Sequence, residues 1–114
     1  MSLLTEGQRT KLIANFRANQ QGLETLDPCP VVKIITPDAN ATWLLTEFDP
    51  CTELFFGLCD LGFGFPELGY VALADLETCR GALGLPVERD RWFKVTKPLS
   101  AYANEAARTG RIIA

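Results

Sequence analysis

The sequence contains no histidine, and this absence excludes several kinds of active site. Catalytic triads of serine, histidine and aspartate, cysteine–histidine pairs and HExxH zinc sites all require an imidazole group. Switches in which a histidine changes its charge near neutral pH are excluded for the same reason. The function of this chain therefore belongs to a class that does without an imidazole.

Long apolar segments are also missing, since no uncharged apolar run approaches the roughly 18 residues of a membrane span. The first residues, Met1–Glu6, lack the basic stretch and apolar core of a signal peptide, so we expect a cytoplasmic protein without a membrane partner. With 114 residues, 47% of them hydrophobic and 22% charged, the chain has the size and composition of one globular domain, 1–114.

The four cysteines do not form a recognisable metal-binding motif. They are Cys29, Cys51, Cys59 and Cys79, and no two of them are spaced as CxxC. A site made of four thiolates is still geometrically possible, but in a cytoplasmic protein we expect reduced thiols and neither a metal nor a cofactor. Cys59 lies inside an apolar run and is predicted to be a small core residue.

The formal net charge of −3 hides an uneven distribution. Residues 27–77 carry nine acidic residues and one lysine, whereas residues 78–114 carry seven basic residues and three acidic ones. The ordinary interpretation is that the two segments neutralise each other within the fold, and the alternative is a charged surface offered to a partner. Because phosphates repel a net acidic chain, we expect a protein partner, with a basic surface, and no direct binding of nucleic acid.

The order of the predicted elements is typical of an α+β protein. The expected strands are 31–36, 41–48, 53–59 and 67–73, with a further strand over 91–96. Turns as short as those between the first four strands join only antiparallel neighbours, so these strands form a meander. A first helix is expected from the N-cap Thr5, with Gln8 completing a capping box, to Gly22. The other helices are expected over 74–80 and from Pro98 or Ser100 through Arg108, closed by Gly110.

These elements predict an antiparallel meander sheet of four to five strands, with the N- and C-terminal helices packed on one face. Alternation along the second strand places one set of side chains toward each face of the sheet. One set is Trp43, Leu45 and Glu47, and the other is Thr42, Leu44, Thr46 and Phe48.

Several runs of the sequence resemble a bacterial family known as domain of unknown function 2958. The runs are 36–38, 41–50, 56–60, 66–70, 80–81, 84–90, 99–103 and 110–112. They occur in the same order as in the family and are spread from residue 36 to residue 112. The resemblance implies a cytoplasmic protein that serves a mobile genetic element such as a plasmid. It brings no established activity, and no catalytic or binding residue is transferred from it.

The first candidate site is the glycine-rich loop between the third and fourth strands. Its glycines are better explained by a tight hairpin than by a phosphate cradle, because a strand follows and not a helix. Phe63 and Phe65 either fold back as a lid on the core, which is the more ordinary interpretation, or remain exposed as partner anchors. In the second case, Asp60 and Glu67 would steer a basic partner toward them.

The second candidate surface is the run of alternating charges that precedes Trp92. Its ordinary interpretation is a network of ion pairs on the protein surface. The functional interpretation is that Arg89 and Arg91 hold an anionic group beside the indole ring of Trp92.

Our leading hypothesis is a non-enzymatic protein-interaction module with an accessory or anti-defence role. The alternative is a small enzyme that uses Mg²⁺ to hydrolyse phosphodiesters, since paired carboxylates are suitable ligands for this ion. The carboxylates available for such a site lie around two turns of the meander: Glu47, Asp49, Asp60 and Glu67.

Overall fold

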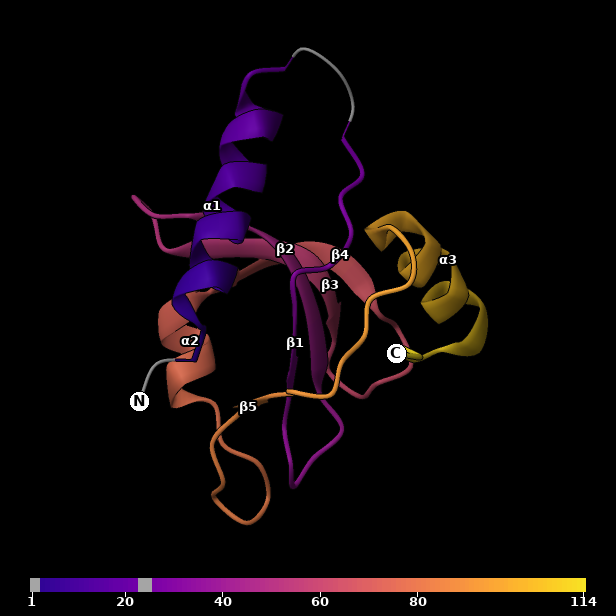
Figure 1. Ribbon diagram of the computed structural model, residues 1–114. Coiled ribbons are helices and arrows are strands. Elements are labelled where there is room, and N and C mark those ends of the chain that lie inside the picture. Colours follow the sequence, from indigo (N-terminus) through magenta and orange to yellow (C-terminus); the bar gives the residue numbers. More distant parts are fainter. Residues whose placement is uncertain (1–2, 23–25) are drawn as a thin grey trace.

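The computed structural model of the protein describes residues 3–22 and 26–114, so Met1 and Ser2 lie outside the described residues. Its centre is a five-stranded sheet with the strand order β4-β3-β2-β1-β5, in which every neighbouring pair is antiparallel (Figure 1). The strands are β1 (Val32–Ile35), β2 (Thr42–Asp49), β3 (Leu54–Asp60), β4 (Glu67–Ala72) and β5 (Glu88–Arg89). The helices are α1 (Glu6–Gln20), α2 (Leu73–Thr78) and α3 (Leu99–Thr109). The predicted α+β class and the meander of the first four strands are confirmed.

Helix α1 begins where the sequence predicts. The backbone N–H of Gln8 donates to the Thr5 hydroxyl over 3.1 Å, and the Gln8 side-chain oxygen accepts from the backbone N–H of Thr5 over 3.0 Å. This capping box satisfies donors that would otherwise lack a partner in the first turn. The helix ends at Gln20, close to Gly22, whose positive φ of 64° takes the chain out of the helical conformation.

A β-bulge interrupts the regular alternation along β2. The register with β3 shifts between Leu45 and Glu47, so one extra residue lies on β2 at this point. After the bulge, Phe48 joins the same core cluster as Trp43 and Leu45. The predicted alternation is therefore wrong beyond Leu45, because a bulge changes the face to which the following side chains point.

The N- and C-terminal helices pack against opposite faces of the sheet, so the prediction that they share one face is wrong. Leu12 of α1 and Leu76 of α2 belong to a cluster with Trp43, Leu45 and other residues of the sheet. A second cluster unites residues of the other face with α3; its buried members are Leu44, Leu58, Leu99, Tyr102 and Ala106. Figure 1 shows α1 and α3 on the two sides of the strands. Neighbouring residues of one strand, Leu44 and Leu45, thus serve different cores.

The fifth strand occupies Glu88–Arg89 and not 91–96. It pairs with the end of β1, and the N–H of Asp90 makes one more backbone hydrogen bond to the Lys33 carbonyl over 2.9 Å. The Asp90 carboxylate then accepts the backbone N–H of Trp92 over 2.9 Å, a local turn that leads the chain away from β1. None of the helices in the described part of the chain is both long and apolar enough to cross a bilayer.

Candidate functional site

Most carboxylates of the acidic segment 27–77 are engaged inside the fold. Asp27 accepts the N–H and the hydroxyl of Ser100 at the start of α3, and Asp38 accepts the N–H groups of Leu83 and Leu85. Asp49 and Asp60 likewise accept backbone N–H groups, and Glu47 accepts from the Asn19 side chain. Much of the negative charge seen in the sequence therefore holds turns and segments together.

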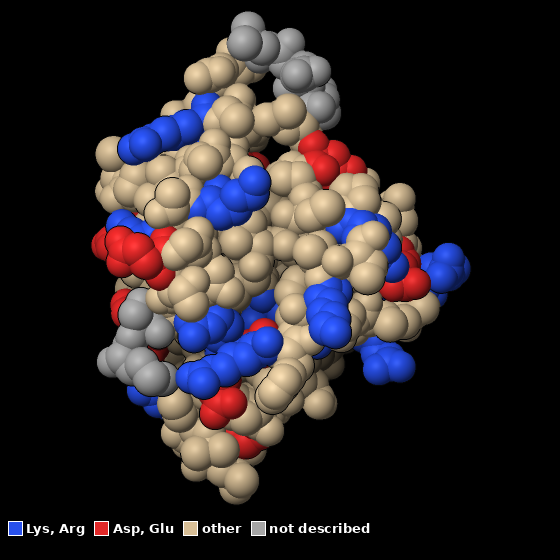
Figure 2. Space-filling view, viewed as in Figure 1, with Lys and Arg blue, Asp and Glu red and all other residues tan. Residues whose placement is uncertain are grey.

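The basic segment 78–114 does not neutralise the acidic segment through ion pairs. In the part of the chain that the structure describes, the ion pairs are Lys33–Asp90, Lys97–Glu105 and Arg108–Glu105. Asp90 and Glu105 are themselves residues of segment 78–114. Figure 2 shows Lys and Arg side chains gathering over β5 and the segment between β5 and α3. Basic groups thus remain available on this side of the molecule.

The loop between β3 and β4 presents its two phenylalanines to solvent. Gly62 and Gly64 have φ angles of 86° and 90°, a left-handed conformation that glycine adopts without strain and that turns the chain tightly. Phe63 and Phe65, which follow these glycines, are 80% and 81% exposed. The prediction that they form a lid on the core is wrong, and the alternative of exposed aromatic side chains agrees with the structure.

The exposed apolar surface continues from this loop along β4. Leu68 and Tyr70 alternate with residues of the other face, and both are exposed because α3 covers this face only in part. The ring of Tyr70 contacts Phe56 on β3, with the ring centroids 5.1 Å apart. We call Leu61, Phe63, Phe65, Leu68 and Tyr70 the hairpin surface. Leu68 and Tyr70 were not among the residues predicted from the sequence, although their period-two spacing is the signal that would have found them.

The two acidic residues proposed to steer a partner differ in their surroundings. Asp60 is only 4% exposed, and its two carboxylate oxygens accept the N–H groups of Gly62 and Ile112 over 2.9 Å and 3.0 Å. This residue ties the hairpin loop to the C-terminal segment and is not offered to a partner. Glu67, at the start of β4, is exposed, and the alternation along the strand places it on the face opposite Leu68 and Tyr70.

A cavity of about 650 Å³ lies beside β5 at the opposite edge of the sheet. We call it the β5 cavity. Leu3, Leu76 and Val87 contribute apolar side chains to its wall. Charged residues and one aromatic residue also line it, and they are Glu77, Glu88, Arg89, Asp90, Arg91 and Trp92. All three residues of the second candidate surface thus line one cavity. Its apolar wall could not be predicted from the sequence, because the residues of the wall come from three separate segments.

The charged residues of this run do not form the network of ion pairs that was the ordinary expectation. Asp90 pairs with Lys33 over 3.4 Å, and Arg89 donates to the carbonyl of Leu3 over 3.0 Å. No carboxylate of the described residues lies within 4 Å of the guanidinium of Arg89 or Arg91. Trp92 is 90% exposed. A ligand can therefore contact the Arg91 guanidinium, the remaining N–H groups of Arg89 and the indole ring of Trp92.

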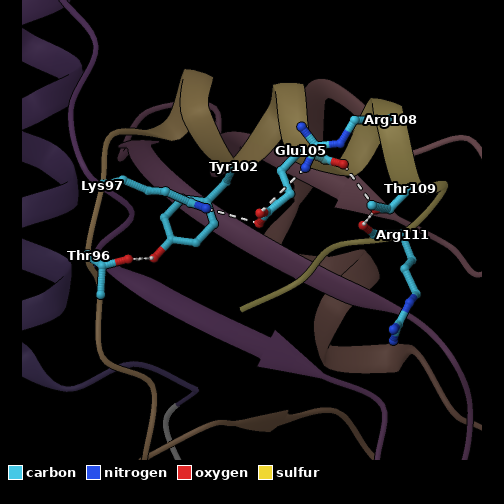
Figure 3. A network of polar contacts seen from close by, with 7 residues as sticks. All are labelled: Thr96, Lys97, Tyr102, Glu105, Arg108, Thr109 and Arg111. Atoms are coloured by element: carbon cyan, nitrogen blue, oxygen red, sulfur yellow. Dashed lines mark hydrogen bonds and ion pairs between the residues drawn. The ribbon is translucent and has the colours of Figure 1, made fainter.

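A polar network holds the segment after Trp92 against α3 (Figure 3). The Tyr102 hydroxyl accepts the backbone N–H of Thr96 over 3.1 Å. Lys97 donates to Glu105 over 2.9 Å, and its ammonium group lies 4.7 Å from the centre of the Tyr102 ring. Each of these groups has a partner within the fold. The network therefore positions the segment between β5 and α3, and its polar groups are not the ones that a ligand would contact.

The carboxylates considered for a magnesium site serve other contacts. Glu47 is 9% exposed, and burial raises its pKa, whereas the Cys51 N–H and the Thr52 hydroxyl lower the pKa of Asp49. Among the described residues, no group of three or more His, Cys, Asp or Glu side chains could hold a metal ion. All four cysteines are free thiols, and burial raises the pKa of Cys59, which packs against the core.

The fold and these two surfaces define a small α+β protein with an antiparallel sheet covered by helices on both faces. The chain belongs to the family of proteins of unknown function DUF2958, whose family model matches residues 3–113. The resemblance noted in the sequence is thereby confirmed. No curated protein and no solved structure matches the chain.

Proposed function

We propose that this protein is a non-enzymatic protein-interaction module and that its hairpin surface is the contact. The observation that supports this proposal is the group of large apolar side chains that stay exposed on one loop and one strand. Single exposed apolar residues are ordinary, but a contiguous group is typical of an interaction site. Aromatic side chains such as Phe63, Phe65 and Tyr70 are among those that contribute most to binding energy.

The position of β4 at the edge of the sheet favours a partner that adds an extended segment. The strand has six residues, pairs with β3 on one side, and has no strand of the described residues on the other side. The free edge presents backbone N–H and C=O groups to a partner strand, and side chains beside the edge then provide specificity. Leu68 and Tyr70 lie on this edge strand, so a segment added to the strand would pass next to their side chains.

The charge around the hairpin surface favours a basic partner. From Leu54 to Cys79 the chain contains no Lys or Arg, and Glu67 is an exposed acid beside the hairpin surface. Such an arrangement attracts a basic segment and speeds its association. We further propose that the partner is met in the cytoplasm, where the interaction serves a mobile element in an accessory or anti-defence role.

Capture of partners from the native host tests this proposal by comparing the parent with surface variants. Because Phe63 and Phe65 are exposed, the double replacement Phe63→Ala with Phe65→Ala should leave the fold intact and abolish capture of the specific partner. Tyr70→Lys should do the same, since a lysine on an edge strand disfavours pairing. Leu83→Ala, at an equally exposed residue of another loop, is the matched control and should capture the partner as the parent does.

The recovered partner then allows the association rate to be measured. Glu67→Lys should mainly slow association, and the phenylalanine replacements should mainly hasten dissociation. Equal capture by the parent and by all hairpin variants would exclude this surface as the contact. Dimerisation of the purified protein that Tyr70→Lys abolishes would also contradict the proposal, because the edge would then be used by a second copy.

A further inference from the structure

We infer that the β5 cavity binds a small nucleotide-like anion, with its anionic group held by Arg89 and Arg91 and its planar ring against Trp92. This site is distinct from the hairpin surface, because β5 and β4 form opposite edges of the sheet. Its volume of about 650 Å³ lies within the range of roughly 300–1,000 Å³ that is usual for small-molecule sites.

The anionic group is inferred from the two guanidinium groups. Arg89 is half-buried and donates to the Leu3 carbonyl, which uses one of its five N–H donors. No described carboxylate neutralises either arginine, although Asp90 lies between them in the sequence, because Asp90 pairs with Lys33. Guanidinium groups bind phosphate and carboxylate through paired hydrogen bonds, so an anion of this kind fits the unpaired arginines.

The planar ring is inferred from Trp92 and from the apolar wall. An indole that is 90% exposed at the rim of a cavity provides a face on which a base can stack. Leu3, Leu76 and Val87 supply apolar contacts deeper in the site. A ligand with an apolar planar part and a charged part would use both kinds of surface.

The remaining carboxylates of the cavity restrict the charge and the hydrogen-bond donors that a ligand can carry. Glu77 and Glu88 also line the cavity, and neither takes part in an ion pair with a described residue. They repel a ligand that carries several negative charges, but they accept hydrogen bonds from N–H groups. A nucleoside monophosphate combines one phosphate, a planar ring and, in adenine, an amino group, so AMP is the probe of choice.

Titration of ¹⁵N-labelled protein with AMP, adenosine and inorganic phosphate tests the site through the two tryptophan indole N–H signals. Trp43 is 4% exposed and provides the internal reference, whereas Trp92 reports on the cavity. We expect AMP to shift the Trp92 signal in a saturable manner and to leave that of Trp43 unchanged. Adenosine and inorganic phosphate, which each make only part of the contacts, should bind at least about tenfold more weakly.

Variants locate the binding. Arg91→Ala should weaken AMP binding about tenfold to hundredfold, and Trp92→Ala about fivefold to hundredfold when binding is followed by calorimetry. Both residues are exposed, so an unchanged Trp43 signal in Arg91→Ala will show that the fold is intact. Arg108→Ala removes an equal charge on α3 and should bind AMP like the parent.

Three results would each overturn the inference. One is the lack of saturable AMP binding at millimolar concentrations, and another is equal affinity in the parent, Arg91→Ala and Trp92→Ala. The third is phosphate binding as tight as AMP binding, which would reduce the site to a simple contact between an anion and basic residues.

Discussion

The two edges of the sheet differ in length and in chemistry. At one edge β5 has two residues, Glu88 and Arg89, both charged. At the other, β4 has six residues, of which Glu67 alone is charged. Short and charged edge strands discourage the addition of another strand, whereas a longer and more apolar edge permits it. The same sheet is thus protected against strand addition at β5 and open to it at β4.

This difference keeps the two proposed binding sites separate. The β4 edge offers backbone groups and a row of exposed apolar side chains, which suit an extended protein segment. At β5 the chain leaves the sheet after two residues, and the surrounding residues line a cavity that suits a small ligand. Changes to the centre of the sheet should therefore affect both sites, and changes near one edge should affect one site.

The largest effect is expected from Gly57→Ala in the central strand β3. A Cβ atom at this residue would lie 2.1 Å from the Leu44 carbonyl oxygen and 2.8 Å from the Leu45 Cα, and both atoms are backbone. Because a backbone atom of a central strand cannot move without disturbing the sheet, we expect the free energy of unfolding to fall by about 3 kcal/mol or more. Urea denaturation measures this loss.

Gly69→Ala provides the matched control for that prediction. Gly69 pairs with Gly57 across β3 and β4, but its Cβ would meet no described atom within 4 Å. We expect its free energy of unfolding to stay within about 0.5 kcal/mol of the parent value. Equal losses in the two variants would mean that the face of β4 at Gly69 is as tightly enclosed as the face of β3 at Gly57, which would contradict the open space at Gly69.

Much of the fold could be predicted from local signals in the sequence. The capping box at Thr5, the turns of the meander and the terminating Gly110 each depend on a few neighbouring residues, and each was predicted correctly. The bulge after Leu45 and the separation of the terminal helices could not be predicted in this way. They depend on how distant segments fill the two sides of the sheet, and local alternation does not report on that filling.

The next effect in size is expected from Asp60→Ala, near the β4 edge. The replacement removes the acceptor of the Gly62 and Ile112 N–H groups, so we expect a loss of about 1–3 kcal/mol in the free energy of unfolding. Hydrogen exchange should accelerate at these two amides, while the Trp92 indole signal stays unchanged. Glu67→Ala is the control at an exposed acid and should change stability by less than about 0.5 kcal/mol. An unchanged stability in Asp60→Ala would instead favour a surface role for this carboxylate.

Asp60 illustrates why the candidate sites could be predicted only in part. In the sequence the carboxylates of Asp60 and Glu67 flank the same loop. The hydrogen bond from the Ile112 N–H to Asp60 depends on the course of the C-terminal segment past β3, and local sequence does not report on that course. Arg89, Arg91 and Trp92 line one cavity, and their grouping could be proposed from the sequence because they are neighbours in the chain. The wall of Leu3, Leu76 and Val87 that makes a cavity of them comes from segments far apart in the sequence.

The smallest effect is expected at Glu47, which lies at the bulge of β2 and belongs to neither edge. Burial raises its pKa above the ordinary value of 4.5, and the hydrogen bond from Asn19 opposes this shift in part. The folded protein therefore binds the proton of Glu47 more tightly than the unfolded chain does, so ionisation of this group lowers stability as the pH rises above about 4.5.

Glu47→Gln keeps an acceptor for Asn19 and has no charge to bury. The difference in unfolding free energy between the variant and the parent should thus shift in favour of the variant from acidic to neutral pH, because the other titrating groups are common to both proteins. Urea denaturation of both proteins across this range measures the difference. A difference that does not change with pH would mean that Glu47 is as well solvated in the fold as in the unfolded chain. A change in partner capture or in the Trp92 signal in Glu47→Gln would contradict the separation of Glu47 from the two edges.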